Sequence, residues 1–161
     1  MKIAFLIIDL QSVYVTNKVS QTEIDQACEV INYVSDLLRS KEHLVIHVQD
    51  VDGRDGTNRE QYEFISEVNI SGKDLTVEKV HSNAFWQTDL EQILRGEAVD
   101  LVVLSGFAAE HCVLFTYNGA RERGFQTVIL QRGVLAENAD SLISMSRDRN
   151  LISYPVIKGL V

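Results

Sequence analysis

Residues 99–113 read VDLVVLSGFAAEHCV, and the rest of the sequence is best understood outward from them. Apart from Asp100, the part up to residue 104 is apolar and rich in β-branched side chains, which predicts a buried strand. Apolar positions then recur at helical spacing from Ala109 to Arg123, and Gly124 follows as a stop, which predicts a helix. Cys112 is therefore expected in the first turn of a helix that begins just beyond the carboxyl end of a buried strand.

The position of Cys112 has two interpretations. Unpaired backbone N–H groups and the positive end of the helix dipole favour the thiolate, so we expect a depressed pKa and a nucleophilic sulfur. A free cysteine is also commonly a small buried apolar residue. Position alone does not decide between the two.

The composition is that of an ordinary globular protein. With 161 residues, 45% hydrophobic and 24% charged, the sequence predicts one domain over residues 1–161. The net charge of -8 and the pI of about 4.9 argue against nucleic acid or an anionic membrane as partner. Two cysteines make no disulfide framework, so we expect a reducing, cytoplasmic location. The apolar start of the chain ends at Asp9, which favours a first strand over a signal peptide.

Strand and helix patterns alternate along the whole chain. We expect strands at 3–8, 44–48, 75–77, 99–104, 125–130 and 151–154, and helices at 20–41, 88–96, 109–123 and 137–149. Residues 51–71 are expected to form a loop with one short helix near 59–66. This alternation predicts a three-layer α/β/α sandwich around a mainly parallel, Rossmann-like sheet of about six strands.

More local expectations concern the helices. Two helix starts resemble capping boxes, Ser20 with Glu23 and Thr88 with Glu91. Cys28 lies on an apolar helical stripe and is expected in the core. The inward side of the helix at 137–149 is expected to carry Ala139, Leu142, Ile143 and Ser146.

Three reactive side chains follow three of the predicted strands. Asp9 follows the first strand, Lys79 the third and Cys112 the fourth. Parallel sheets bind ligands outside the carboxyl ends of their strands, so we expect these three side chains to converge there. Taken singly, Asp9 is also compatible with a turn cap, and Lys79 with a solvated surface charge.

Three segments, in order along the chain, then resemble one known family. Residues 9–14 read DLQSVY, residues 79–90 read KVHSNAFWQTDL, and residues 106–116 read GFAAEHCVLFT. They are similar to the D-x-Q-x-x-F, K-x-x-x-S-A-F-x-x-T-x-L and G-x-x-T-x-x-C-V-x-x-T segments of the isochorismatase-like cysteine hydrolases, the nicotinamidase and isochorismatase relatives. Two positions depart from the family pattern, Asn83 in place of Ser and Ala109 in place of Thr.

The resemblance implies a catalytic triad of Asp9, Lys79 and Cys112 and a cis peptide bond between Phe107 and Ala108. It also implies an oxyanion hole made by the backbone N–H groups of Ala108 and Cys112. In such a triad the acid is the general base for the thiol, and the lysine holds acid and thiolate together. The implied activity is cofactor-free hydrolysis of a small amide, imide or related carbonyl compound through a thioester, at C–N bonds other than peptide bonds. Two alternatives stay open: an isochorismate-type vinyl-ether hydrolase, and a non-catalytic small-molecule binding protein.

The resemblance also guides expectations for binding residues. Four residues near the triad are candidate substrate contacts: Tyr14, Phe85, Trp86 and His111. For the aromatic residues core packing is the default, and Trp86 is the favoured pocket wall. The nicotinamidase branch binds a metal through a D-x-H cluster after the second strand. Here Asp50 and Asp52 stand in that region without the histidine, so we expect a solvated loop and no metal.

The expected partner is a small-molecule substrate. The chain is short for this fold, and the loop at 51–71 offers little to close the site. We therefore expect a homo-oligomer in which a neighbouring subunit shields the pocket.

Overall fold

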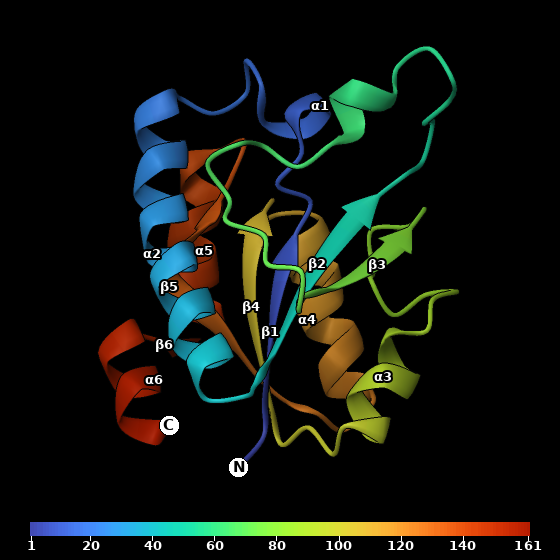
Figure 1. Cartoon of the computed structure of the whole chain (residues 1–161). Coiled ribbons are helices and arrows are strands. Elements are labelled where there is room, and N and C mark those ends of the chain that lie inside the picture. The colour runs from blue at the N-terminus through green and yellow to red at the C-terminus, as the bar shows by residue number, and fades with distance from the viewer.

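The computed structural model describes all 161 residues and contains one six-stranded sheet, shown in Figure 1. The strand order is β3-β2-β1-β4-β5-β6, and every neighbouring pair is parallel. The strands are β1 (Ile3–Ile8), β2 (Leu44–Asp50), β3 (Leu75–Lys79), β4 (Leu101–Phe107), β5 (Gln126–Leu135) and β6 (Leu151–Ile152). The predicted α/β architecture is confirmed, and the strand order reverses between β1 and β4, where such sheets bind ligands.

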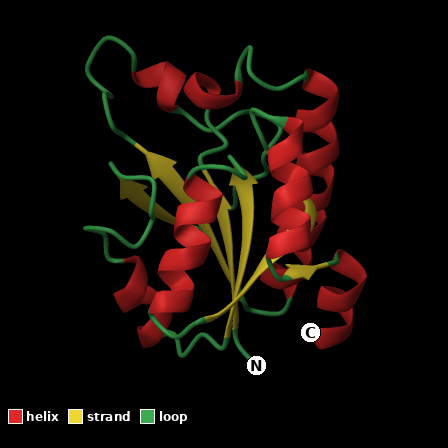
Figure 2. Ribbon diagram, turned by 180° about the vertical axis from the view of Figure 1, so that it is seen from behind, coloured by secondary structure: helices red, strands yellow, loops and turns green.

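Helices cover both faces of the sheet, as Figures 1 and 2 show from opposite sides. The helices α2 (Gln21–Ser40) and α6 (Tyr154–Leu160) pack on one face. The other face carries α3 (Leu90–Gly96), α4 (Cys112–Glu122) and α5 (Ala139–Asp148). None of the helices combines the length and the apolarity that a membrane-spanning segment requires.

The central strand β1 explains why two cores form. Its side chains alternate between the faces: Phe5 packs in the cluster under α2, and Leu6 packs in the cluster under α4. All of its residues are fully buried, because a strand covered on both faces has no polar side. Cys28 lies in the α2 cluster, which confirms its predicted place in the core.

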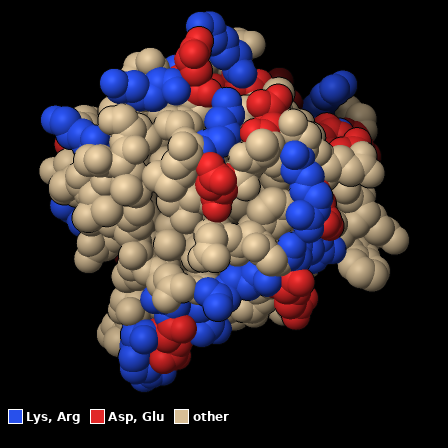
Figure 3. All heavy atoms as spheres, turned by 90° about the horizontal axis from the view of Figure 1, so that it is seen from below, with Lys and Arg blue, Asp and Glu red and all other residues tan.

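The amino ends of the strands lie at the end of the molecule opposite their carboxyl ends. Figure 3 shows this end from below. Lys and Arg side chains alternate there with Asp and Glu side chains. The net negative charge of the chain is therefore not gathered into a single-sign patch on this face.

Two helix starts test the capping predictions. The box at Ser20 is confirmed, because Ser20 accepts from the Glu23 N–H and the Glu23 carboxylate accepts from the Ser20 N–H. The box at Thr88 is wrong. Thr88 donates its hydroxyl to the Ala84 carbonyl at 2.6 Å, and α3 begins after Asp89 without a side-chain cap.

The C-terminal third differs most from expectation. The helix α6 was not predicted, although Pro155 stands in its first turn, where proline is tolerated. In α5 no residue is buried, and Ile143 is 64% exposed rather than inward. Leu142 contacts the core as predicted, together with Met145 three residues later, and this orientation turns Ile143 toward solvent. Ala139 and Ser146, also predicted inward, are exposed.

Candidate active site

The carboxyl ends of the central strands carry the predicted reactive side chains. Asp9 directly follows β1 and has a left-handed backbone, φ +50°, a conformation that aspartate adopts more readily than most residues. Its N–H donates to the Val48 carbonyl at 3.0 Å, so the turn after β1 is tied to β2. Two short helical segments lie beside this turn, α1 (Ser12–Val15) and η1 (Arg59–Tyr62).

Gly106 brings the nucleophile turn close to β1. It pairs with Ile8 at φ +108°, and a Cβ atom at this position would lie 2.1 Å from the Ile8 carbonyl oxygen. Only glycine fits this approach. The cis peptide bond between Phe107 and Ala108 follows, as the family resemblance implied.

The turn then starts the helix that carries the thiol. The Ala108 carbonyl accepts hydrogen bonds from the N–H groups of His111 and Val113, at 3.0 and 3.2 Å. Cys112 is thereby the first residue of α4. The N–H groups of Ala108 and Cys112 donate no hydrogen bond within the protein, so both are free to meet a ligand.

Lys79 joins the reactive groups into one cluster. Its Nζ lies 2.8 Å from Asp9 Oδ2 and 3.5 Å from Cys112 Sγ. Lys79 is only 2% exposed and Asp9 only 3%, so the pair is shielded from water. The predicted convergence of the three side chains is confirmed.

A fourth member, Asp50, was missed by the sequence analysis. Lys79 Nζ donates to Asp50 Oδ2 at 2.7 Å, and Asp50 is buried rather than part of a solvated loop. The reason is that β2 runs two residues beyond its apolar pattern and pairs Asp50 with Lys79 in register. Asp52, two residues later, is exposed as expected.

Gln11 holds the end of β2 in place. Its side-chain Nε2 donates to the carbonyls of Asp50 and Tyr62, at 2.9 and 2.6 Å, and its Oε1 accepts from the Asp50 N–H at 2.8 Å. The buried amide thus replaces the main-chain partners that the strand loses where the sheet ends. The sequence signal that pointed toward Asp50 was its place in the region of the family's D-x-H cluster, which gave no sign of its contact with Lys79.

A second buried cluster fixes the start of β3, the strand that carries Lys79. Arg39 donates two hydrogen bonds to the Asp74 carboxylate, from Nε at 2.9 Å and from Nη2 at 2.6 Å. His47 Nε2 lies 2.9 Å from the same carboxylate. These contacts lock the loop before β3 to α2 and β2, which limits the freedom of Lys79.

The electrostatics of the site correct one expectation. Burial raises the pKa of Asp9 to about 6, although the Lys79 ammonium opposes the shift. Burial, assisted by the charge of Asp9, also raises the pKa of Cys112 to about 12, and Lys79 offsets only part of this. The predicted depressed thiol pKa is therefore wrong, because desolvation and nearby carboxylates outweigh the helix dipole. Above pH 6 the resting site holds an Asp9 carboxylate and a neutral thiol.

The same cluster has the spacing of a metal site. Oxygen atoms of Asp9 and Asp50 and the Cys112 sulfur lie within 4.8 Å of one another. The Lys79 ammonium already contacts all three groups. A metal ion would have to displace this ammonium, so the donor set does not fit a metal.

The candidate substrate contacts fall into different environments. Tyr14 is partly buried edge-on to Tyr62, and burial, assisted by the charge of Asp50, raises the pKa of its hydroxyl. Phe85 is in the core and stacks on Phe125, so it is not available as a pocket wall. Trp86 is 55% exposed, and its ring lies edge-on to His81. His111 is exposed and directly precedes Cys112 at the start of α4.

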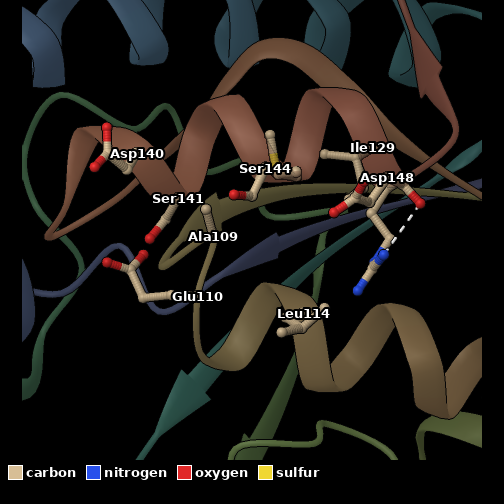
Figure 4. Close-up of a pocket in the computed structure, with 10 residues that line it drawn as sticks. Ala109, Glu110, Leu114, Ile129, Asp140, Ser141, Ser144 and Asp148 are labelled. Atoms are coloured by element: carbon tan, nitrogen blue, oxygen red, sulfur yellow. Dashed lines mark hydrogen bonds between the residues drawn. The ribbon is translucent and has the colours of Figure 1, made fainter.

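A separate cavity of about 230 Å³ lies between α4 and α5. Figure 4 shows Glu110 and Ser141 pointing toward one another across it. The cavity touches the nucleophile turn through Ala109 and Glu110, but no triad residue lines it. Glu110 Oε1 accepts from the N–H groups of Glu137 and Asn138, both at 2.9 Å, which ties this turn to the start of α5.

Comparisons with known proteins find similar sequences and similar folds. Maleamate amidohydrolase from Pseudomonas putida is 27% identical over 77 residues, which are 48% of this chain and 36% of that protein. An isochorismatase-like hydrolase from Alkaliphilus metalliredigens superposes with a TM-score of 0.85 at 20% identity over 99% of both chains. N-carbamoylsarcosine amidase from Thermoplasma acidophilum superposes with a TM-score of 0.79 at 24% identity over 92% of both chains. These two likenesses establish a shared fold.

The comparison of sequences identifies the family as well as the fold. The family model of the isochorismatase domain matches residues 3–146, which is most of the chain and includes every residue of the Lys79 cluster. The chain therefore belongs to the isochorismatase family and is a hydrolase of that family.

Proposed function

We propose that this hydrolase cleaves a C–N bond in a small amide, imide or related carbonyl compound, with Cys112 as nucleophile. The observation that carries the proposal is the buried Lys79 ammonium, which contacts both the Asp9 carboxylate and the Cys112 sulfur. Two similar proteins, maleamate amidohydrolase and N-carbamoylsarcosine amidase, are named for hydrolysis of this class.

Acylation begins with the resting carboxylate of Asp9. As the Cys112 sulfur attacks the substrate carbonyl carbon, its proton passes to Asp9, which acts as general base. This coupling suits a thiol whose pKa is raised to about 12, because a free thiolate is scarce at neutral pH. Lys79 stays charged throughout and offsets the negative charge as it moves from oxygen to sulfur.

The oxyanion that forms on the carbonyl oxygen needs hydrogen-bond donors. The backbone N–H groups of Ala108 and Cys112 supply them in this proposal, and neither is engaged elsewhere. The tetrahedral intermediate collapses when the C–N bond breaks, and ammonia or an amine leaves with the proton held by Asp9. The product of this half-reaction is a thioester on Cys112.

Deacylation reverses the proton path. Asp9 takes a proton from water, and the resulting hydroxide attacks the thioester carbonyl. The carbon–sulfur bond breaks, the carboxylic acid leaves, and the proton on Asp9 returns to the Cys112 sulfur. No redox partner is consumed in either half of the cycle.

We also propose that the working form is a homo-oligomer. Two of the candidate substrate contacts, Trp86 and His111, are exposed. A second copy packed over this edge would shield the site from water during the thioester stage.

The test is a screen of small amides and imides for ammonia release. Wild type is compared with Cys112→Ala and with Cys28→Ala, which removes the other thiol. Activity that survives Cys112→Ala excludes the thioester route. Ligand binding without turnover by the wild-type protein favours a binding protein instead.

A further inference from the structure

We propose that Asp50 is a positioning residue that holds the Lys79 ammonium between two carboxylates and thereby keeps Asp9 basic enough to accept the Cys112 proton. The inference rests on the proposed function, because it concerns the proton transfer that starts the reaction. It adds a fourth, acidic member to the Asp9, Lys79 and Cys112 cluster.

The first support is the way in which Lys79 is shared. Its Nζ lies 2.7 Å from Asp50 Oδ2 and 2.8 Å from Asp9 Oδ2, so both carboxylates form an ion pair with the same ammonium. The third contact is the Cys112 sulfur at 3.5 Å. An ammonium has three N–H donors, and these three acceptors use all of them.

The second support is the rigidity of Asp50. Its Oδ1 accepts from the Asp52 N–H at 2.9 Å, and its main chain is held on both sides by Gln11. A group fixed by this many contacts can fix Lys79 in turn.

The third support is the charge balance. The charged and titratable groups that face one another come from five elements: Asp9 after β1, Asp50 in β2, Lys79 in β3, Cys112 in α4 and Tyr14 in α1. With both carboxylates ionised and the thiol neutral, the buried cluster carries one excess negative charge. A proton on Asp9 neutralises that excess, so the second carboxylate makes Asp9 a better proton acceptor.

Without Asp50, Lys79 would neutralise Asp9 alone. A carboxylate paired one-to-one with a buried ammonium is a weak base, because its ionised form is strongly favoured. Burial is the largest cause of the raised pKa of Asp9 and of Cys112, and the charge of Asp50 adds to both shifts.

The experiment measures the pH dependence of Cys112 alkylation by iodoacetamide, quantified by peptide mass spectrometry. This readout needs no substrate. The proteins compared are wild type, Asp50→Asn and the matched control Asp52→Asn, which removes an exposed carboxylate from the same segment. Circular dichroism checks the fold of each, and Asp50→Ser is the second neutral variant if Asp50→Asn does not fold.

Removal of the Asp50 charge is expected to shift the acidic inflection of Cys112 alkylation to lower pH. For unit charges 4.8 Å apart, Coulomb's law gives a shift of about 0.6 to 2.5 pH units between effective dielectric constants of roughly 80 and 20. Asp50→Glu keeps the charge and is expected to restore the inflection toward that of wild type. Asp52→Asn is expected to leave it in place.

The outcome separates this proposal from the proposed function. An inflection at the same pH in wild type and in the folded neutral variant overturns the role of Asp50, even if amides are hydrolysed. A shifted inflection supports it, even if no amide in the screen is hydrolysed. Where a substrate is found, the acidic limb of kcat/KM is expected to move with the alkylation inflection.

Discussion

Replacement of Gly106 by alanine is expected to destabilise the protein more than any other single methyl addition at a glycine. The added Cβ would lie 2.1, 2.5 and 2.8 Å from the carbonyl oxygen, amide nitrogen and carbonyl carbon of Ile8, all rigid backbone atoms. Relief requires β1 and β4 to separate by about 1 Å at their paired ends, since real Cβ contacts rarely fall below 3.0 Å.

The cost has two sources. A non-glycine residue at φ +108° adds about 1–3 kcal/mol of backbone strain, and the overpacking adds about 1–3 kcal/mol more. We therefore expect the free energy of unfolding to fall by about 4 kcal/mol, and Tm by roughly 10 °C for a chain of this size. The separated strands also carry Asp9 and the Cys112 turn apart, so hydrolysis should be lost with stability.

The assay is urea unfolding followed by far-UV circular dichroism, with Gly72→Ala as the control. A Cβ at Gly72 meets no atom within 4 Å, so this variant should stay within about 0.5 kcal/mol of wild type. A loss of less than about 1 kcal/mol in Gly106→Ala, with an unchanged denaturant slope, would refute the reading of the strand contact.

Four further expectations concern the site. Because Asp9 acts as a carboxylate and its pKa is raised to about 6, kcat/KM should fall as pH drops through 6, to roughly one tenth at pH 5; full activity at pH 5 would indicate the ordinary value of 3.8. Cys112→Ala and Asp9→Asn should each abolish ammonia release while the circular dichroism spectrum stays that of wild type, and measurable turnover in either would contradict its assigned role. Brief iodoacetamide treatment should label Cys112 before Cys28, because Cys28 is 2% exposed in the core; mass spectrometry would show the reverse order if exposure does not govern reactivity. Light scattering after gel filtration should give a mass above the 18.1 kDa of one chain, and a monomer at micromolar concentration would rule out the shielding subunit.

The sequence was sufficient to place three of the four residues in the Lys79 cluster. Asp9, Lys79 and Cys112 each follow a predicted strand, and parallel strands bring their carboxyl ends to one edge. That rule of sheet geometry needs no knowledge of side-chain contacts. The three segments that resemble the isochorismatase-like cysteine hydrolases then indicated the type of reaction.

The burial of Asp50 and its contact with Lys79 were not predicted, because an apolar pattern identifies the middle of a buried strand and not its polar end. Gln49 and Asp50 are polar, yet both are buried in β2. The Gln49 side chain donates to the Tyr62 carbonyl, and Asp50 is satisfied by Gln11 and Lys79. Such polar satisfaction depends on residues distant in sequence and has no local signature.

The thiol pKa was misjudged for a related reason. The helix start near Cys112 is visible in the sequence, whereas the burial of the sulfur and the proximity of Asp9 are set by tertiary packing. Ile143 shows the same limit on a helix. Its apolar character predicted an inward side chain, but the orientation of α5 was decided by Leu142 and Met145.

The shared lysine also bears on the order of events in folding. Its contacts with Asp50 and Cys112 span 29 and 33 positions of sequence, and its contact with Asp9 joins strands that are not neighbours in the sheet. None of these contacts can form within a hairpin or a single helix. Each can form only after a crossover connection has brought the parallel strands together. Partly folded chains therefore lack the proton acceptor beside the sulfur. The nucleophile becomes competent only when the central strands are in register, which couples the appearance of reactivity to the completion of the sheet.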